Sequence, residues 1–176
     1  MTTPEQLKNQ LRSYDGRSVA MLSELAAGHS GDGAFLDAVI ALAGDAEPRV
    51  SDGATRLVKM HLDEGGALSP ARTSALLGAC RSVVSWQAQL HLCQSVARLD
   101  LSARQAAALA PWLTPLLSHK RPFVRAWALD ALCAVARKNV RFKAIALQAL
   151  RDADQDAAAS VRARARNIAR TLDCAS

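Results

Sequence analysis

Aromatic residues are scarce in this chain of 176 residues, which holds three Phe, three Trp and one Tyr. β-Branched residues are also few, since Val, Ile and Thr together number 20. Strands are enriched in both classes, so an all-β fold is disfavoured. Ala and Leu are abundant instead, with 36 and 24 copies, and both favour helices. The composition therefore predicts an all-α fold.

Long apolar runs are also missing. No stretch approaches the roughly 18 apolar residues that a membrane span needs, and the opening MTTPEQLKNQ lacks the basic-then-apolar pattern of a secretory signal. We therefore expect a soluble, cytoplasmic protein without a membrane partner. The cysteines at 80, 93, 133 and 174 include no CxxC pair, and the histidines are scattered. The sequence thus predicts buried free thiols, no disulfide, no metal site and no cofactor.

Motifs for catalysis are absent as well. The sequence has no Gly-rich phosphate loop, no GxSxG, no HExxH and no paired Cys-His arrangement. We therefore predict that the protein is not an enzyme.

Helix start and stop residues recur along the chain. Thr3 and Gln6 form a capping box, as do Ser102 and Gln105, and glycines separate the apolar-periodic segments. These patterns predict about ten short helices, at 3–13, 17–27, 33–43, 48–62, 70–80, 83–98, 103–117, 122–138, 140–150 and 157–172.

A repeat becomes visible when the second helix of each later pair is aligned. Each aligned segment has a Val followed four residues later by an Ala. The pairs are Val50/Ala54, Val84/Ala88, Val124/Ala128 and Val161/Ala165. The valines are 34, 40 and 37 residues apart, a period typical of stacked helical hairpins.

The residues Pro122-Phe123-Val124-Arg125, followed by Ala128 and Leu132, resemble the second helix of a HEAT repeat. The resemblance implies an α-solenoid of about five HEAT-like hairpins in a single domain, 1–176. Residues 3–27 would be a degenerate N-terminal hairpin and 157–172 a basic C-terminal capping helix. Such arrays serve as scaffolds, adaptors, enzyme subunits and nucleic-acid binders, so the resemblance does not specify an activity.

Helical periodicity assigns a buried side to two of these helices. In 157–172 it predicts burial of Val161, Ala165, Ile168, Ala169 and Leu172. In 122–138, apolar residues that include Trp127 surround the helix. Asp130 and Arg137 mark a narrow exposed line, which indicates an interior position in the stack.

Positive charge is concentrated late in the chain. Residues 1–118 carry a net charge of −1, from 10 basic and 11 acidic residues, and residues 119–176 carry +7, from 12 and 5. The candidate binding residues lie in this last third: Lys120, Arg121, Arg125, Trp127, Asp130, Arg137, Lys138, Arg141, Lys143, Arg162, Arg166 and Arg170.

Three functional hypotheses follow. The leading one is a non-enzymatic scaffold or adaptor that binds another protein through the face lined by the second helices. The alternative is binding of nucleic acid or another polyanion by the basic last third. A remote third is a base-excising enzyme, because the architecture is similar to HEAT-like alkylpurine DNA glycosylases with Trp, Asp and Arg on a concave face. A competing interpretation does not require a basic binding surface. In it, Arg125 and Arg162 are structural arginines that pair with acidic groups of an adjoining repeat.

Overall fold

The computed structural model describes residues 3–173, with side chains through residue 171. Over this range the chain forms ten α-helices, one short 3-10 helix (η1) and no strand, which confirms the all-α prediction. None of these helices is both long and apolar enough to cross a lipid bilayer. The elements are α1 (Pro4–Arg12), α2 (Val19–Ala27), α3 (Gly33–Leu42), α4 (Pro48–Asp63), α5 (Pro70–Ala79), α6 (Trp86–Val96), α7 (Ala103–Leu116), α8 (Pro122–Lys138), η1 (Val140–Phe142), α9 (Lys143–Asp154) and α10 (Ala159–Asp173).

Local capping explains many of these boundaries. Thr3 and Gln6 form a complete capping box at the start of α1, and Ser102 and Gln105 form another at α7. The predicted helix over 140–150 is instead the short η1 followed by α9. Asn139 accounts for this start, because its side chain accepts a hydrogen bond from the Arg141 N–H and so caps η1.

The helices group into two compact units, residues 1–99 (unit 1) and residues 100–176 (unit 2). Each unit has its own set of packed helices. A single repeat domain spanning both units stays a prediction.

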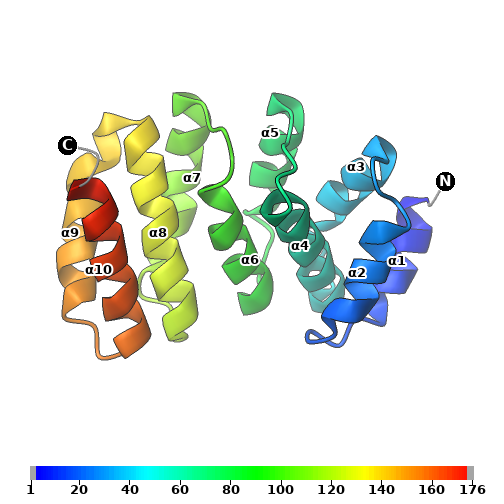
Figure 1. The fold of residues 1–176 in the computed structure, drawn as a ribbon, viewed down its shortest axis with the longest axis horizontal. Helices are drawn as coiled ribbons and strands as arrows, with labels where there is room; N and C mark the ends of the chain where they lie inside the picture. The colour runs from blue at the N-terminus through cyan, green and yellow to red at the C-terminus, as the bar shows by residue number, and fades with distance from the viewer. Residues whose placement is uncertain (1–2, 174–176) are drawn as a thin grey trace. The chain divides into compact units, whose positions relative to one another are not determined.

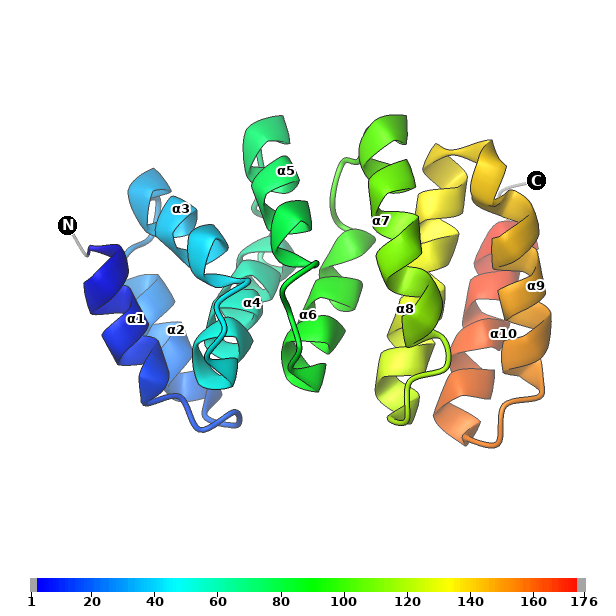
Figure 2. The same ribbon diagram turned by 180° about the vertical axis from the view of Figure 1, so that it is seen from behind.

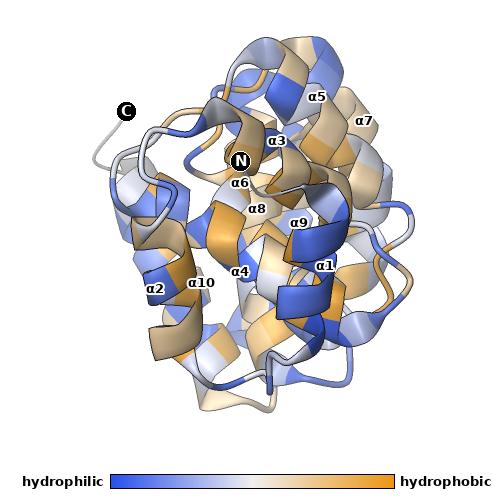
Figure 3. Cartoon of the chain, turned by 90° about the vertical axis from the view of Figure 1, so that its right-hand side faces the viewer, coloured by the Kyte–Doolittle hydropathy of each residue, from blue (hydrophilic) through white to orange (hydrophobic). Residues whose placement is uncertain are grey.

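Unit 1 has two helical layers. Helices α1, α3 and α5 pack side by side in one layer, and α4 packs against α2 and α6 in the other (Figures 1 and 2). Leu7 and Leu11 are fully buried on α1, whose surface alternates between hydrophilic and hydrophobic bands (Figure 3). At Gly53 on α4, a Cβ would lie 2.8 Å from a methyl carbon of Leu11, so the two helices approach closely where no side chain intervenes.

Unit 2 is built around α8, which packs against α7, α9 and α10. Val124, Ala128, Leu132 and Val135 on α8 are all fully buried. This confirms the predicted burial of most of α8, and its interior position in a stack stays a prediction.

One residue of the repeat pairs and one burial prediction do not fit the structure. The repeat residue Val84 is 75 % exposed because it lies in the loop before α6, and the neighbouring Val83 is buried. Ala169 is exposed on α10, whereas Val161, Ala165 and Ile168 are buried as predicted. The side chain of Leu172 lies outside the described residues.

Candidate functional site

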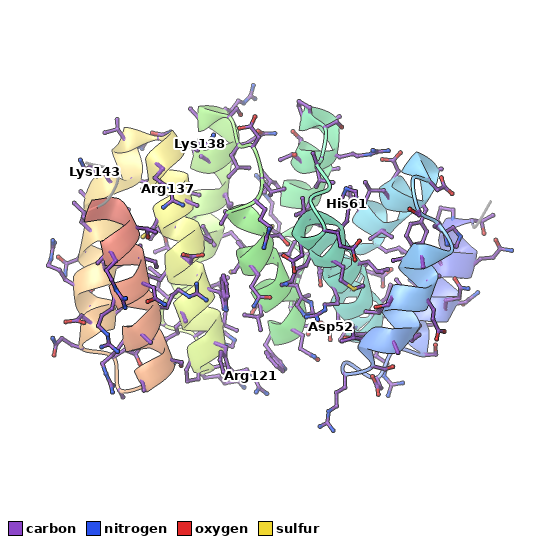
Figure 4. The ribbon with its side chains drawn as sticks, in the orientation of Figure 1. Asp52, His61, Arg121, Arg137, Lys138 and Lys143 are labelled. Atoms are coloured by element: carbon purple, nitrogen blue, oxygen red, sulfur yellow. The ribbon has the colours of Figure 1, made fainter. Side chains whose placement is uncertain are left out.

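The predicted basic residues lie at both ends of α8 rather than on one surface. Lys120 and Arg121 precede the helix, and Arg137 and Lys138 end it (Figure 4). The 17 residues of α8 separate these ends by roughly 25 Å at about 1.5 Å per residue. Arg141 in η1 and Lys143 at the start of α9 follow directly after the second end, and both are exposed.

Arg125 binds the loop between α9 and α10. Its Nε and Nη2 donate to the two carboxylate oxygens of Asp156, each at 2.8 Å, and its Nη1 donates to the carbonyl oxygen of His119 at 2.8 Å. The hydrogen bond from Arg125 is the main reason that the pKa of Asp156 lies below its ordinary value. Arg125 is therefore occupied as a structural arginine.

Arg162 has a structural role of a different kind. Its Nη1 donates to the backbone carbonyl oxygens of Asp156 and Ala157, at 2.6 and 2.9 Å. The expected hydrogen bond to an acidic side chain is replaced by two bonds to backbone carbonyls. Arg162 therefore holds the start of α10, while Arg166 and Arg170 are exposed farther along that helix.

An aromatic and charged group lies along the exposed line of α8. Phe123 is 62 % exposed, and Trp127 and Asp130 are half-buried. The guanidinium of Arg164 on α10 stacks over the Trp127 ring, 3.7 Å from its centroid. Trp127 therefore lies at the surface of α8 rather than among the core residues that were expected to surround the helix. We call Phe123, Trp127, Asp130 and Arg164 the α8 surface cluster.

The charges within this cluster are coupled. Burial raises the pKa of Asp130, and the positive charges of Arg164 and Arg137 oppose that rise. Neither the role of Arg164 nor the exposure of Phe123 was predicted from the sequence. Arg164 is 37 positions from Trp127, and no local pattern indicates that the two meet. Phe123 belongs to the repeat motif, which gave no indication of its exposure.

Buried polar residues connect α4 and α6 in unit 1. The Asp52 carboxylate accepts a hydrogen bond from the backbone N–H of Ala88 at 3.0 Å, in the first turn of α6. The Ser85 side chain accepts from the N–H of Gln87 in the same turn. Burial raises the pKa of Asp52, and the hydrogen bonds from Ser85 and Ala88 oppose the rise. These contacts satisfy the otherwise unpaired donors at the start of α6.

Thr55 and His91 form a hydroxyl–imidazole pair between the same helices, with 3.2 Å between Thr55 Oγ1 and His91 Nδ1. Such a pair resembles a nucleophile and its base, but both residues are buried. Burial lowers the pKa of His91 to about 3, too low for an effective general base near neutral pH. The pair therefore satisfies polar atoms in the core.

A cleft of about 350 Å³ opens in unit 1, lined by residues of α2, α3, α4 and α5 and the adjoining loops. His29 and Phe35 stack at its wall with ring centroids 4.4 Å apart. Arg72 at its edge is already bound to Asp37 and to the carbonyl oxygen of Gly33. His61, labelled in Figure 4, lies 3.4 Å from the carbonyl oxygen of Ala67. Polar side chains that line the cleft, such as Arg72 and His61, therefore already contact other groups of the chain.

The three described cysteines are free and buried. Burial raises the pKa of the Cys80 thiol to about 12 and that of Cys133 to about 11, which suppresses the reactive thiolate. The predicted role as small hydrophobic residues is confirmed for Cys80, Cys93 and Cys133. Cys174 lies outside the described residues.

Comparisons with known proteins do not place this chain in a family: no family model, curated protein or solved structure matches it.

Proposed function

We propose that the chain is a HEAT-like α-solenoid that acts as a non-enzymatic scaffold and binds another protein through the face of its second helices. The layered packing of unit 1 supports this arrangement, as does the bidentate contact of Arg125 with Asp156 in unit 2. Burial of the repeat pairs Val50/Ala54, Val124/Ala128 and Val161/Ala165 also supports it.

The α8 surface cluster carries the proposal for protein binding. The chain has only seven aromatic residues, and two of them, Phe123 and Trp127, lie four positions apart on the exposed line of α8. A soluble helical protein gains more stability by burying such side chains, so their placement at the surface needs another reason. Contact with a partner supplies that reason.

The residue types in the cluster match the energetic centre of a protein interface. Trp and Arg are enriched among residues whose truncation costs the most binding energy, and aromatic residues are enriched at interface cores generally. Arg164 holds the Trp127 ring by its stacking contact, so little side-chain entropy remains to be lost on binding. The cluster would take an apolar anchor of a partner, flanked by a carboxylate that reaches Arg164.

The test begins with a photo-reactive amino acid at position 123 of the full chain, used in extracts of the source cells. A discrete adduct that identifies one protein is expected at position 123. The same substitution at Leu147, a 41 % exposed residue on α9, is the control and should give no such adduct.

The purified partner then allows a quantitative measurement by calorimetry. Trp127→Ala should weaken binding by about 2 kcal/mol or more, roughly 30-fold, as expected of a central interface residue. Leu147→Ala should leave the affinity within about twofold, since most interface energy comes from few residues. Equal affinities for wild type and Trp127→Ala, with both proteins folded by circular dichroism, would contradict the proposal.

A further inference from the structure

One end of unit 2 collects exposed basic side chains from several elements. At this end α8 finishes, η1 and α9 begin, and α7 begins nearby. The side-chain amide of Asn139 donates to the carbonyl oxygen of Ala103 at 3.2 Å, which joins the end of α8 to the start of α7. Arg137, Lys138 and Lys143 are seen together at this end in Figure 4. Helix α10 runs back along α9 and finishes at the same end (Figure 1).

We call this end of unit 2 the basic end. Its cationic residues are all exposed: Arg104, Arg137, Lys138, Arg141, Lys143 and Arg170. Among the side chains that the structure describes there, Asp100 is the one carboxylate, and it pairs with Lys138 at 3.1 Å. The other five cations have no ion-pair partner among the side chains that the structure describes.

The opposite end of unit 2 differs in charge. It holds the carboxylates of Asp152, Asp154 and Asp156 in the last turn of α9 and the following loop. Asp156 is the partner of Arg125, and Arg162 binds carbonyl oxygens of the same loop. Arg125 and Arg162 are thus already engaged at that end, and its exposed cations, Lys120, Arg121 and Arg151, are accompanied by three carboxylates. The basic end instead has six exposed cations and one described carboxylate.

Few apolar groups accompany the charges. Two exposed large hydrophobic residues lie at or next to the basic end among the described residues: Val140, which is 80 % exposed, and Ile145 in the first turn of α9, which is 39 % exposed. Protein interfaces have an apolar core depleted of charge, whereas attachment to a phosphate backbone requires mainly Lys and Arg. The composition of this surface therefore fits phosphates better than an acidic protein.

We propose that the basic end binds the phosphate backbone of duplex nucleic acid without sequence preference. This surface is distinct from the α8 surface cluster, so the proposal stands apart from the binding of a protein partner. Five phosphate contacts imply a log–log salt slope of about −4.5, at about −0.9 for each contact. Affinity should then fall about 500-fold when salt rises from about 50 to about 200 mM.

The test measures fluorescence anisotropy of a labelled DNA duplex of arbitrary sequence, about 20 base pairs long, with the full chain at several salt concentrations. The variant R141E/K143E changes two exposed residues of the basic end, for which the described residues include no ion-pair partner. Loss of two contacts should reduce the slope to about −2.7 and the salt response to about 40-fold. Affinity at the lowest salt should fall at least tenfold.

The matched control is K120E/R151E, which makes the same change in net charge with exposed residues outside the basic end. It should retain most of the affinity and the steep slope. Three outcomes would overturn the proposal: no binding at low salt, equal losses in both variants, or equally tight binding of polyglutamate, which would point to an acidic protein. Trp127→Ala should bind DNA as the wild type does, so this test is separate from that of the scaffold function.

Discussion

Leu132 and Arg166 represent the two extremes of burial in unit 2. Leu132 is fully buried on α8, and Arg166 is exposed on α10. Leu132→Ala should lower the free energy of unfolding by about 2–5 kcal/mol, because it leaves a cavity in a packed core. Arg166→Ala should change it by no more than about 0.5 kcal/mol. Urea denaturation of both variants checks this, and similar small effects would contradict the assigned facing of the two helices.

His91 should make unit 1 sensitive to acid. Burial lowers its pKa from 6.5 to about 3, and the nearby charges of Arg56 and Lys59 add to the effect. The folded state therefore keeps the imidazole neutral, while the unfolded chain takes up a proton below pH 6.5. The stabilising contribution is complete above 6.5 and declines toward pH 3 by about 1.4 kcal/mol for each pH unit.

The measurement compares wild type with His91→Gln by chemical denaturation between about pH 7.5 and 4.5, a range that covers the ordinary titration of histidine. The wild type should lose stability faster as the pH falls. Asp52 faces the same region with a raised pKa, which acts in the opposite direction, but it is present in both proteins and cancels. Parallel pH dependences would show that His91 does not titrate as inferred.

Helical periodicity predicted the burial of most single residues but not of all. Val161, Ala165 and Ile168 follow the period of α10 and are buried, whereas Ala169 was assigned to the same side and is exposed. Trp127 also fits an apolar pattern, yet Arg164 from another helix meets it at the surface. A periodic pattern assigns a side of a helix, but it does not contain the identity of the residue that packs there.

At the scale of elements, Arg125 ties α8 to the loop before α10. We expect Arg125→Lys to destabilise the protein nearly as much as Arg125→Ala, because an ammonium cannot reproduce the bidentate contact with Asp156. A double-mutant cycle with Asp156→Asn should give a coupling energy of about 1–2 kcal/mol, since the two side chains are only 18 % and 17 % exposed. Additive effects of the two substitutions would contradict a direct interaction.

Helix starts are predictable from the sequence only where the capping residues lie close together in the chain. The boxes at Thr3 and Ser102 involve residues three positions apart and were predictable from the sequence. The start of α6 was predicted three residues too early, at 83 rather than 86. Asp52 contributes to the cap of α6, because its carboxylate accepts a hydrogen bond from the N–H of Ala88, 36 positions away. Only the packing of α4 against α6 brings that carboxylate to the helix end.

At the scale of the whole molecule, the two units differ in charge. Residues 1–99 carry 9 basic and 10 acidic residues, a net charge of −1, and residues 100–176 carry 13 and 6, a net charge of +7. The net positive charge of the chain therefore comes from residues 100–176.

The sequence by itself determined that the chain is helical, about where most helices begin and end, and that positive charge lies late in the chain. These properties depend on composition, periodicity and contacts within one turn of helix. Tertiary structure decided which of the late basic residues contact other side chains or the backbone of the same chain. Arg125 and Asp156 are 31 positions apart, and Trp127 and Arg164 are 37 apart. Such pairs form only when separate helices pack. The repeat motif therefore offered Arg125 as a structural arginine, but it could not identify Asp156 as its partner or show that Arg164 meets Trp127.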